Sequence, residues 1–263
     1  MTPLLKEPSI LSQGVYLQLV TKIKFLDEAI IRSNDPEEVL TFKYQSLGNR
    51  FVIPWRKIKA KLRRLVMEKQ RSLNIEPGCH LKDDLCMKCS SCFIFGGTGE
   101  TSSANVPYNI LARILGESFI STSQVGEIQP YTQNAVDEED LTTGQALMSI
   151  TPVPKETEFI GVITLKDPTP EIASIIVDNL KRLTRIGARS VEWGRVETTI
   201  LGFKLSDREA LTAYNLIDSK IDGFGKIDDL KLPVVEEAYK TLDEQVKNLI
   251  KPLLKKKPEE SKE

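Results

Sequence analysis

The spacing of hydrophobic residues changes several times along the chain, and each change predicts an element. A run rich in β-branched residues predicts a long strand at 14–25. Further short strands are expected at 28–33, 38–44 and 49–53. After Pro54 the apolar positions recur with a period of 3.6, which predicts a helix from Trp55 to about Leu73.

The second half of the chain begins with a stretch of weak periodicity, from Gly99 to about Glu156, in which 106–116 is a possible short helix. A strand is then expected at 157–167. The helix at 167–187 should begin with Thr169 as its cap and Pro170 at its first position, and end at Gly187. The remaining predictions are a strand at 190–205 with a bulge at Gly194, and helices at 206–221 and 233–254.

This order of elements predicts an α+β fold with an RRM- or ferredoxin-like core, an antiparallel sheet that carries its helices on one face and leaves the other face open. The expected divisions are 14–75 for the first half of the core, 76–156 for an insertion, 157–205 for the second half and 206–263 for a C-terminal helical region. Many RNA-binding modules share such a core, but a fold does not fix a function.

Composition narrows the class of protein. The 263 residues are 40% hydrophobic and 28% charged, with a net charge of −1, as expected of a globular protein. No run approaches the roughly 18 apolar residues of a membrane span. The N-terminus also lacks the pattern of a secretory signal, so we expect a cytoplasmic protein. Thiols stay reduced there, and clustered cysteines then favour metal binding over disulfides.

All four cysteines and the only histidine fall within fourteen positions: Cys79, His80, Cys86, Cys89 and Cys92. Two C-x2-C spacings suit a structural Zn2+, which takes four tetrahedral thiolate or imidazole ligands. The spacing does not say which four of the five bind it. An iron–sulfur cluster or unliganded cysteines are the alternatives. Because there is one histidine, we expect neither catalytic zinc nor a histidine-activated nucleophile.

The helix that follows Pro54 is strongly basic. It carries Arg56, Lys57, Lys59, Lys61, Arg63, Arg64, Lys69 and Arg71 against a single acid, Glu68. Such a face can bind the phosphates of a nucleic acid without reading its sequence. The alternative is an ordinary solvated face of an amphipathic helix.

Several segments together resemble a known family, the repeat-associated (RAMP, Cas-seven-like) backbone subunits of CRISPR effector complexes. Residues 157–202 are similar to the second half of those subunits, and "NRFVIPWRKIKAKLRR" is similar to their strand and basic helix. The cysteine loop running into "FIFGG" resembles the metal-binding insertion of the type I-D branch. Residues 131–159 resemble the thumb hairpin.

The resemblance implies a subunit that polymerises along CRISPR RNA and presents it for pairing with a target DNA or RNA strand. Its partners would be copies of itself in a helical filament and other subunits of the complex. The resemblance assigns RNA contact to Arg50, Lys57, Lys61, Arg64, Tyr131, Gln133, Asn134, Arg185 and Arg189.

Two other functions remain open from the sequence. Related type III subunits cut target RNA with a loop aspartate and a divalent ion. This chain offers Asp83, Asp84, Asp137 and Asp140 for that role, although we expect a scaffold without catalytic residues. The third possibility is a zinc-ribbon factor that binds duplex DNA.

Overall fold

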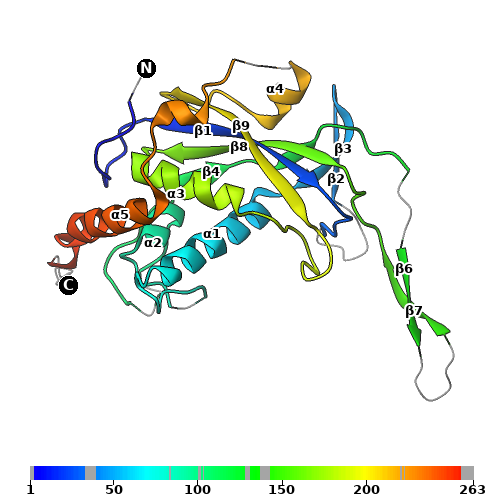
Figure 1. The fold of residues 1–263 in the computed structure, drawn as a ribbon, viewed down its shortest axis with the longest axis horizontal. Helices are drawn as coiled ribbons and strands as arrows, with labels where there is room; N and C mark the ends of the chain where they lie inside the picture. The colour runs from blue at the N-terminus through cyan, green and yellow to red at the C-terminus, as the bar shows by residue number, and fades with distance from the viewer. Residues whose placement is uncertain are drawn as a thin grey trace, which may run out of the picture.

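A seven-stranded antiparallel sheet forms the centre of the protein (Figure 1). The structure, a computed structural model, describes residues 3–32, 40–82, 84–99, 102, 104–127, 131–136, 143–219, 221 and 223–255, with 131–136, 143–150 and 255 as backbone only. The strands of the sheet are β1 Tyr16–Phe25, β2 Thr41–Tyr44, β3 Gly48–Ile53, β4 Ile114–Gly116, β5 Phe119–Ser121, β8 Glu158–Lys166 and β9 Val196–Ser206.

The strand order confirms the predicted fold class. The sheet runs β2-β3-β5-β8-β1-β9, and β4 pairs with β8 beside β5. The first strand therefore lies between the two strands of the second half, as in a ferredoxin-like core. Strand β1 pairs with β8 and with β9 along nearly its whole length.

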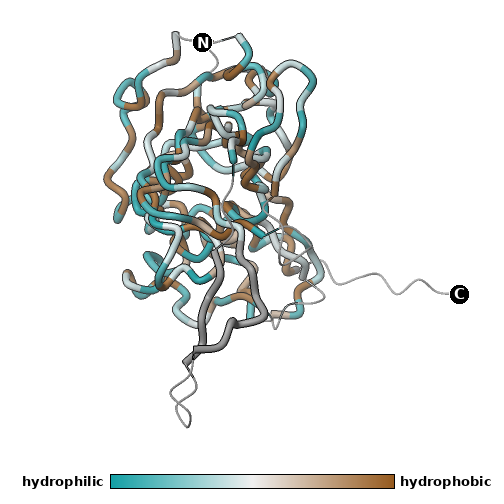
Figure 2. Tube along the Cα trace, turned by 90° about the vertical axis from the view of Figure 1, so that its right-hand side faces the viewer, coloured by the Kyte–Doolittle hydropathy of each residue, from teal (hydrophilic) through white to brown (hydrophobic). Residues whose placement is uncertain are grey.

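Four helices lie on one face of the sheet: α1 Trp55–Ser72, α2 Ser90–Phe95, α3 Pro170–Lys181 and α5 Val235–Ile250 (Figure 1). Hydrophobic stretches run through the middle of the trace, where these helices meet the strands (Figure 2). As predicted, α3 begins with Pro170 at its first position, and the Thr169 hydroxyl accepts a hydrogen bond from the amide of Ile172. It ends at Lys181, well before Gly187.

The other face of the sheet is partly covered, whereas an open face was expected. Gln18 on β1 donates to the carbonyl of Leu211 and accepts from the amides of Ala210 and Leu211. Val20, Val162, Leu211 and Leu216 then form a second, smaller core. Because that segment lies on the sheet in extended form, the helix predicted at 206–221 shrinks to α4, Ala213–Asp218.

Other differences have local causes. Within its described residues, the strand expected at 28–33 forms isolated bridges, among them Ala29 to Val153 and Ile30 to Ala188, because two separate segments share its edges. The helix expected at 106–116 is absent, since Ile110 pairs with Gly97 and the chain then enters β4. The bulge lies within the β1–β9 pairing, after Val20, and not at Gly194.

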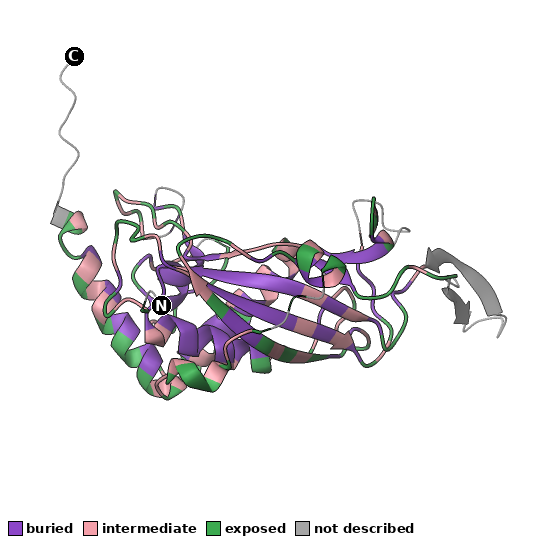
Figure 3. Cartoon of the chain, turned by 90° about the horizontal axis from the view of Figure 1, so that it is seen from above, coloured by how far each residue is buried: buried purple, intermediate pink, exposed green. Residues whose placement is uncertain are grey.

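Outside the sheet, β6 Tyr131–Val136 and β7 Thr143–Ile150 pair as a two-stranded hairpin that extends away from the body (Figure 1). The expected thumb-like hairpin is therefore present. The 3-10 turns η1 Ile227–Leu230 and η2 Leu253–Lys255 flank α5, which shows a buried and an exposed side along its length (Figure 3). The division into four regions stays a prediction.

Gly161 on β8 provides a test of this packing. A Cβ atom there would lie 2.0 Å from the ring of Phe119, so we expect Gly161→Ala to lower the free energy of unfolding by about 1–3 kcal/mol. Gly126→Ala is the matched control, since nothing lies within 4 Å of its Cβ position. Chemical denaturation measures both variants, and equal stabilities would contradict this packing.

Glu117, between β4 and β5, attaches α4 to the sheet, because its carboxylate accepts from the amide of Ala213. Burial, with a smaller contribution from the nearby Glu209, raises the pKa of Glu117 to about 7 against the lowering effect of hydrogen bonds from the backbone. The folded state therefore holds a proton that the unfolded state has lost, and stability falls as the pH rises from about 4.5 to above 7. Between pH 5 and pH 8 we expect the free energy of unfolding of the wild type to fall by up to about 3 kcal/mol more than that of Glu117→Gln. Denaturation midpoints of both proteins at the two pH values measure this difference, and equal losses of stability would refute the prediction.

Candidate metal centre and nucleic-acid interface

The four cysteine sulfurs lie together. The Sγ atoms of Cys79, Cys86, Cys89 and Cys92 are all within 4.8 Å of one another, and Cys79 lies 3.7 Å from both Cys89 and Cys92. A tetrahedral ion with metal–sulfur bonds of about 2.3 Å needs sulfurs about 3.8 Å apart. A disulfide needs about 2.05 Å. The spacing therefore fits a shared metal ion, and all four thiols are free.

The local backbone explains this arrangement. Cys89 caps α2, and its sulfur accepts a hydrogen bond from the amide of Cys92. The amide of Cys86 donates to the sulfur of Cys79 in the same way. Met87, between two of the cysteines, adopts a left-handed conformation that turns the chain back toward the cluster. Each C-x2-C segment therefore presents two sulfurs to one point.

Four thiols this close cannot all ionise unless a cation is present. Hydrogen bonding from Cys79 lowers the pKa of Cys86, whereas hydrogen bonding with Cys79 raises the pKa of Cys92. These hydrogen bonds thus favour ionisation of one thiol and oppose ionisation of another. A divalent metal ion replaces these protons and makes four thiolates compatible.

His80 does not belong to this group, although the sequence left it as a candidate ligand. Its Nε2 atom lies 2.9 Å from the carboxylate of Asp84, and its Nδ1 atom lies 2.9 Å from the carbonyl oxygen of Gly78. The ring is exposed and held by these two partners, outside the thiol cluster. The candidate donor set is therefore the four cysteines.

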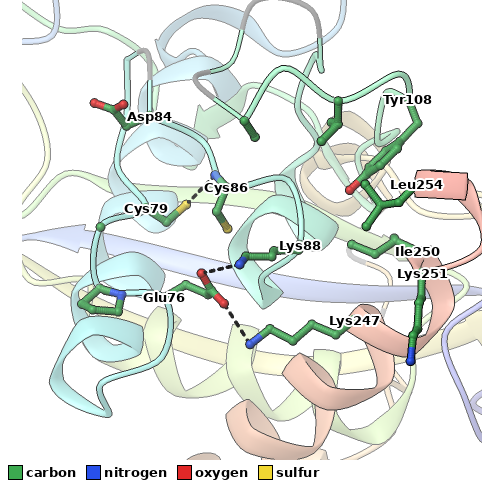
Figure 4. Close-up of a pocket in the computed structure, with 14 residues that line it drawn as sticks. Glu76, Cys79, Asp84, Cys86, Lys88, Tyr108, Lys247, Ile250, Lys251 and Leu254 are labelled. Carbon is green, nitrogen blue, oxygen red and sulfur yellow. Dashed lines mark hydrogen bonds and ion pairs between the residues drawn. The ribbon is translucent and has the colours of Figure 1, made fainter. Parts of the chain in front are cut away.

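Cationic side chains of α5 and the cysteine loop lie beside the cluster (Figure 4). The Glu76 carboxylate accepts from Lys88 and Lys247, and these residues border a cavity of about 580 Å3 into which Cys86 opens. Helix α5, whose role the sequence left open, therefore braces the loop.

The basic helix α1 has two different sides. Arg63 donates to the carbonyl of Gly96, and Lys69 pairs with Glu236, so these two side chains stabilise the fold. Lys57, Lys61 and Arg64 lie on another side of the helix and form no ion pair with any residue that the structure describes. Burial lowers the pKa of Lys57, and the neighbouring Arg56 and Arg32 lower it further. Like charges thus accumulate at this side.

Arg50 has a structural role, and we do not retain it as an RNA contact. It is 8% exposed, and its guanidinium donates to the carbonyls of Leu47, Ser121 and Thr122. The sequence showed its charge but not the three backbone oxygens around it.

Arg185 and Arg189, which are also predicted to contact RNA, lie in a loop beside residues 28–30. Ile30 accepts from the amide of Ala188 in the loop that carries Arg185 and Arg189. The adjacent Ala29 pairs with Val153, at the base of the β6–β7 hairpin. The loop and the hairpin base are therefore neighbours across 28–30. Arg189 is exposed, and Arg185 is half-buried and donates to the carbonyl of Trp193.

Two sets of predicted residues are less fully defined. Tyr131, Gln133 and Asn134 belong to β6, of which the structure describes the backbone. Of the candidate aspartates, Asp84 is paired with His80, while Asp83, Asp137 and Asp140 lie outside the described residues.

Comparison with known proteins places the chain. The family described as Csc2 Crispr matches residues 11–263. The chain belongs to the Csc2 family. A search of curated proteins finds no match. Among solved structures, the fold of this Csc2-family chain is similar to Thermofilum pendens Csc2, with a TM-score of 0.58 and 20% identity over 93% of this chain and 86% of that one.

A second similar structure comes from a type IV-B CRISPR complex, with a TM-score of 0.50 and 13% identity over 74% of this chain and 93% of that one. The resemblance to CRISPR subunits is thereby confirmed at the level of family and fold. No helix within the described part of this Csc2-family chain is long and apolar enough to cross a membrane.

The metal centre can be tested by measuring the metal content of variants. We expect His80→Ala to retain bound metal, because its ring lies outside the thiol cluster, and Cys89→Ser to lose most of it along with thermal stability. Elemental analysis of purified protein and melting curves with and without a chelator measure both effects. Equal metal loss in the two variants would contradict a four-cysteine site.

Proposed function

We propose that the chain is a guide-RNA-binding backbone subunit of a type I-D CRISPR surveillance complex in the cytoplasm. Copies of it polymerise along the CRISPR RNA and present the guide for pairing with a target strand. The observation that carries this proposal is the side of α1 with Lys57, Lys61 and Arg64, whose charge no described acid neutralises.

The like charges on this side of α1 repel one another when no anion is bound. Lys57, Lys61 and Arg64 are four and three positions apart, and like charges at such spacings destabilise a helix by about 0.2–0.5 kcal/mol per pair. Glu68, the only acid of the helix, is engaged by Arg182 at 2.9 Å. A row of phosphates along this side removes the repulsion.

The N-terminus of α1 adds to the positive electrostatic potential of this surface. Pro54 precedes the helix without a side-chain cap, and the first turn carries no acid. The positive end of the helix dipole therefore lies beside Arg56 and Lys57, a combination that favours phosphate groups.

Neighbouring segments extend the surface from α1 toward the hairpin. Arg32 lies close enough to Lys57 to lower its pKa, and it follows the 28–30 segment that joins the Arg185–Arg189 loop to the hairpin base. RNA following this route would leave α1, pass the loop and reach Tyr131, Gln133 and Asn134 on β6. Base pairing then supplies sequence recognition, while the protein holds the backbone.

The proposed cofactor is a structural Zn2+ held by the four cysteines. Thiolate-rich tetrahedral sites favour zinc or iron–sulfur centres, and four protein ligands leave zinc no open position for a substrate. In this role the ion fixes the loop that α5 braces.

Replacing Lys57, Lys61 and Arg64 together by alanine tests the guide-binding surface. We expect weaker binding of CRISPR RNA and a slope of log affinity against log salt that is shallower by about 2–3, since each lost phosphate contact releases fewer counterions. Fluorescence anisotropy at several salt concentrations measures both quantities.

A matched control removes the same charge elsewhere. Lys204, Lys231 and Lys240 are exposed and lie away from α1 in the sequence, and their triple alanine variant should keep the wild-type slope. If both triple variants lose the same affinity, the binding follows net charge, and this surface is not the guide site.

A further inference from the structure

Three aromatic rings gather at the β2 edge of the sheet, on the face opposite α1. Phe42 and Tyr44 are two positions apart on β2 and share a face, with ring centroids 4.8 Å apart. The ring of Tyr44 lies 6.0 Å from that of Tyr214 on α4. Phe42 is nevertheless 59% exposed, which leaves a broad apolar ring in contact with water.

The surrounding hydrogen bonds hold these rings in place. The hydroxyls of Tyr214 and Ser46 lie 2.5 Å apart, and Ser46 also donates to the carboxylate of Asp218. The Tyr214 hydroxyl is thus occupied, and its ring is fixed beside Tyr44 before any ligand arrives. Fixed rings bind with a smaller loss of conformational entropy than mobile ones.

An exposed amide lies next to the rings. Gly48, the cross-strand partner of Tyr44, has a φ of +75°, and a Cβ atom there would lie 2.8 Å from Nε2 of Gln124. Glycine therefore leaves room for the Gln124 amide at this point. A carboxamide offers both a donor and an acceptor, which can pair with the edge of a nucleobase.

We propose that Phe42, Tyr44, Tyr214 and Gln124 form a second nucleic-acid site, which stacks an unpaired base of a single strand. Sheet proteins of this architecture stack bases on aromatic residues of the open face. Here Gln18 and Val20 at the centre of that face are covered by the segment around Leu211. The same segment continues into α4 and supplies Tyr214 to the exposed edge, so the surface available for stacking lies there.

This site differs from the guide surface in both position and chemistry. It lies across the sheet from α1, and its four side chains are uncharged, so it contributes stacking and base contacts where α1 contributes phosphate contacts. The two sites should therefore respond differently to salt, and either can fail without the other.

Phe42→Ala tests the proposal on the full-length chain, with oligouridine RNA and oligothymidine DNA as probes in anisotropy titrations at several salt concentrations. We expect affinity for at least one polymer to fall about 5- to 150-fold with an unchanged salt slope. Phe42→Trp should restore binding, because it keeps an aromatic face. A loss with one polymer or with both identifies which kind of strand the site takes.

Leu201→Ala is the matched control, a similarly exposed apolar residue on β9, and it should bind like the wild type. Unchanged affinity of Phe42→Ala for both polymers would overturn the proposal. So would a variant that binds both normally but no longer associates with other copies of the chain, since the rings would then form a protein contact.

Discussion

The burial of β1 on both faces and both edges constrains the rest of the molecule. Leu17, Leu19 and Ile23 are fully buried beneath the helices, while Gln18 and Val20 are buried on the opposite side. Strands β8 and β9 occupy its two edges. The centre of the sheet is therefore closed to any ligand, and every candidate binding surface lies at the periphery: the outer side of α1, the hairpin and its adjoining loop, and the β2 edge.

The cysteine loop is held to this core by interactions of two kinds. Met67 on α1 belongs to one buried cluster with Cys79, Cys89 and Cys92, so the cysteines pack against the C-terminal half of the basic helix. The Ser90 hydroxyl reaches the backbone of Tyr239 on α5, and the hydroxyl of Tyr239 donates to the carbonyl of Val66 on α1. A metal ion that fixes this loop would thereby also fix α5 against α1, which connects the proposed zinc to the shape of the guide surface without any role in chemistry.

The sequence predicted those elements whose pattern is local. Strand β1, helix α1 and the start of α3 follow from periodicity, Pro54 and the Thr169–Pro170 pair. The length of helix α4 was overestimated because the Gln18 amide, almost 200 positions away, binds the backbone of Ala210 and Leu211 in extended form. No window of sequence contains that contact.

The candidate site shows the same division between local and distant information. Spacing indicated a metal cluster, but only the fold separates His80 from the four thiols, since Asp84 and the Gly78 carbonyl hold its ring. The family resemblance assigned RNA contact to Arg50, whereas two of the three carbonyls around it come from β5 and the adjacent turn, distant in the sequence. The exposed ring of Phe42 gave no signal at all, because an alternating strand residue ordinarily predicts burial.

The charge on the described part of α1 suits phosphate binding. Cutting a strand requires a hydrated metal ion beside a phosphate, with carboxylates free to hold it. The four-thiol cluster itself offers no carboxylate, and Asp84, the one candidate aspartate that the structure describes, lies 2.9 Å from His80. Asp83, Asp137 and Asp140 lie outside the described residues. The scaffold that we propose therefore rests on the charged side of α1, which can neutralise phosphates but cannot activate water.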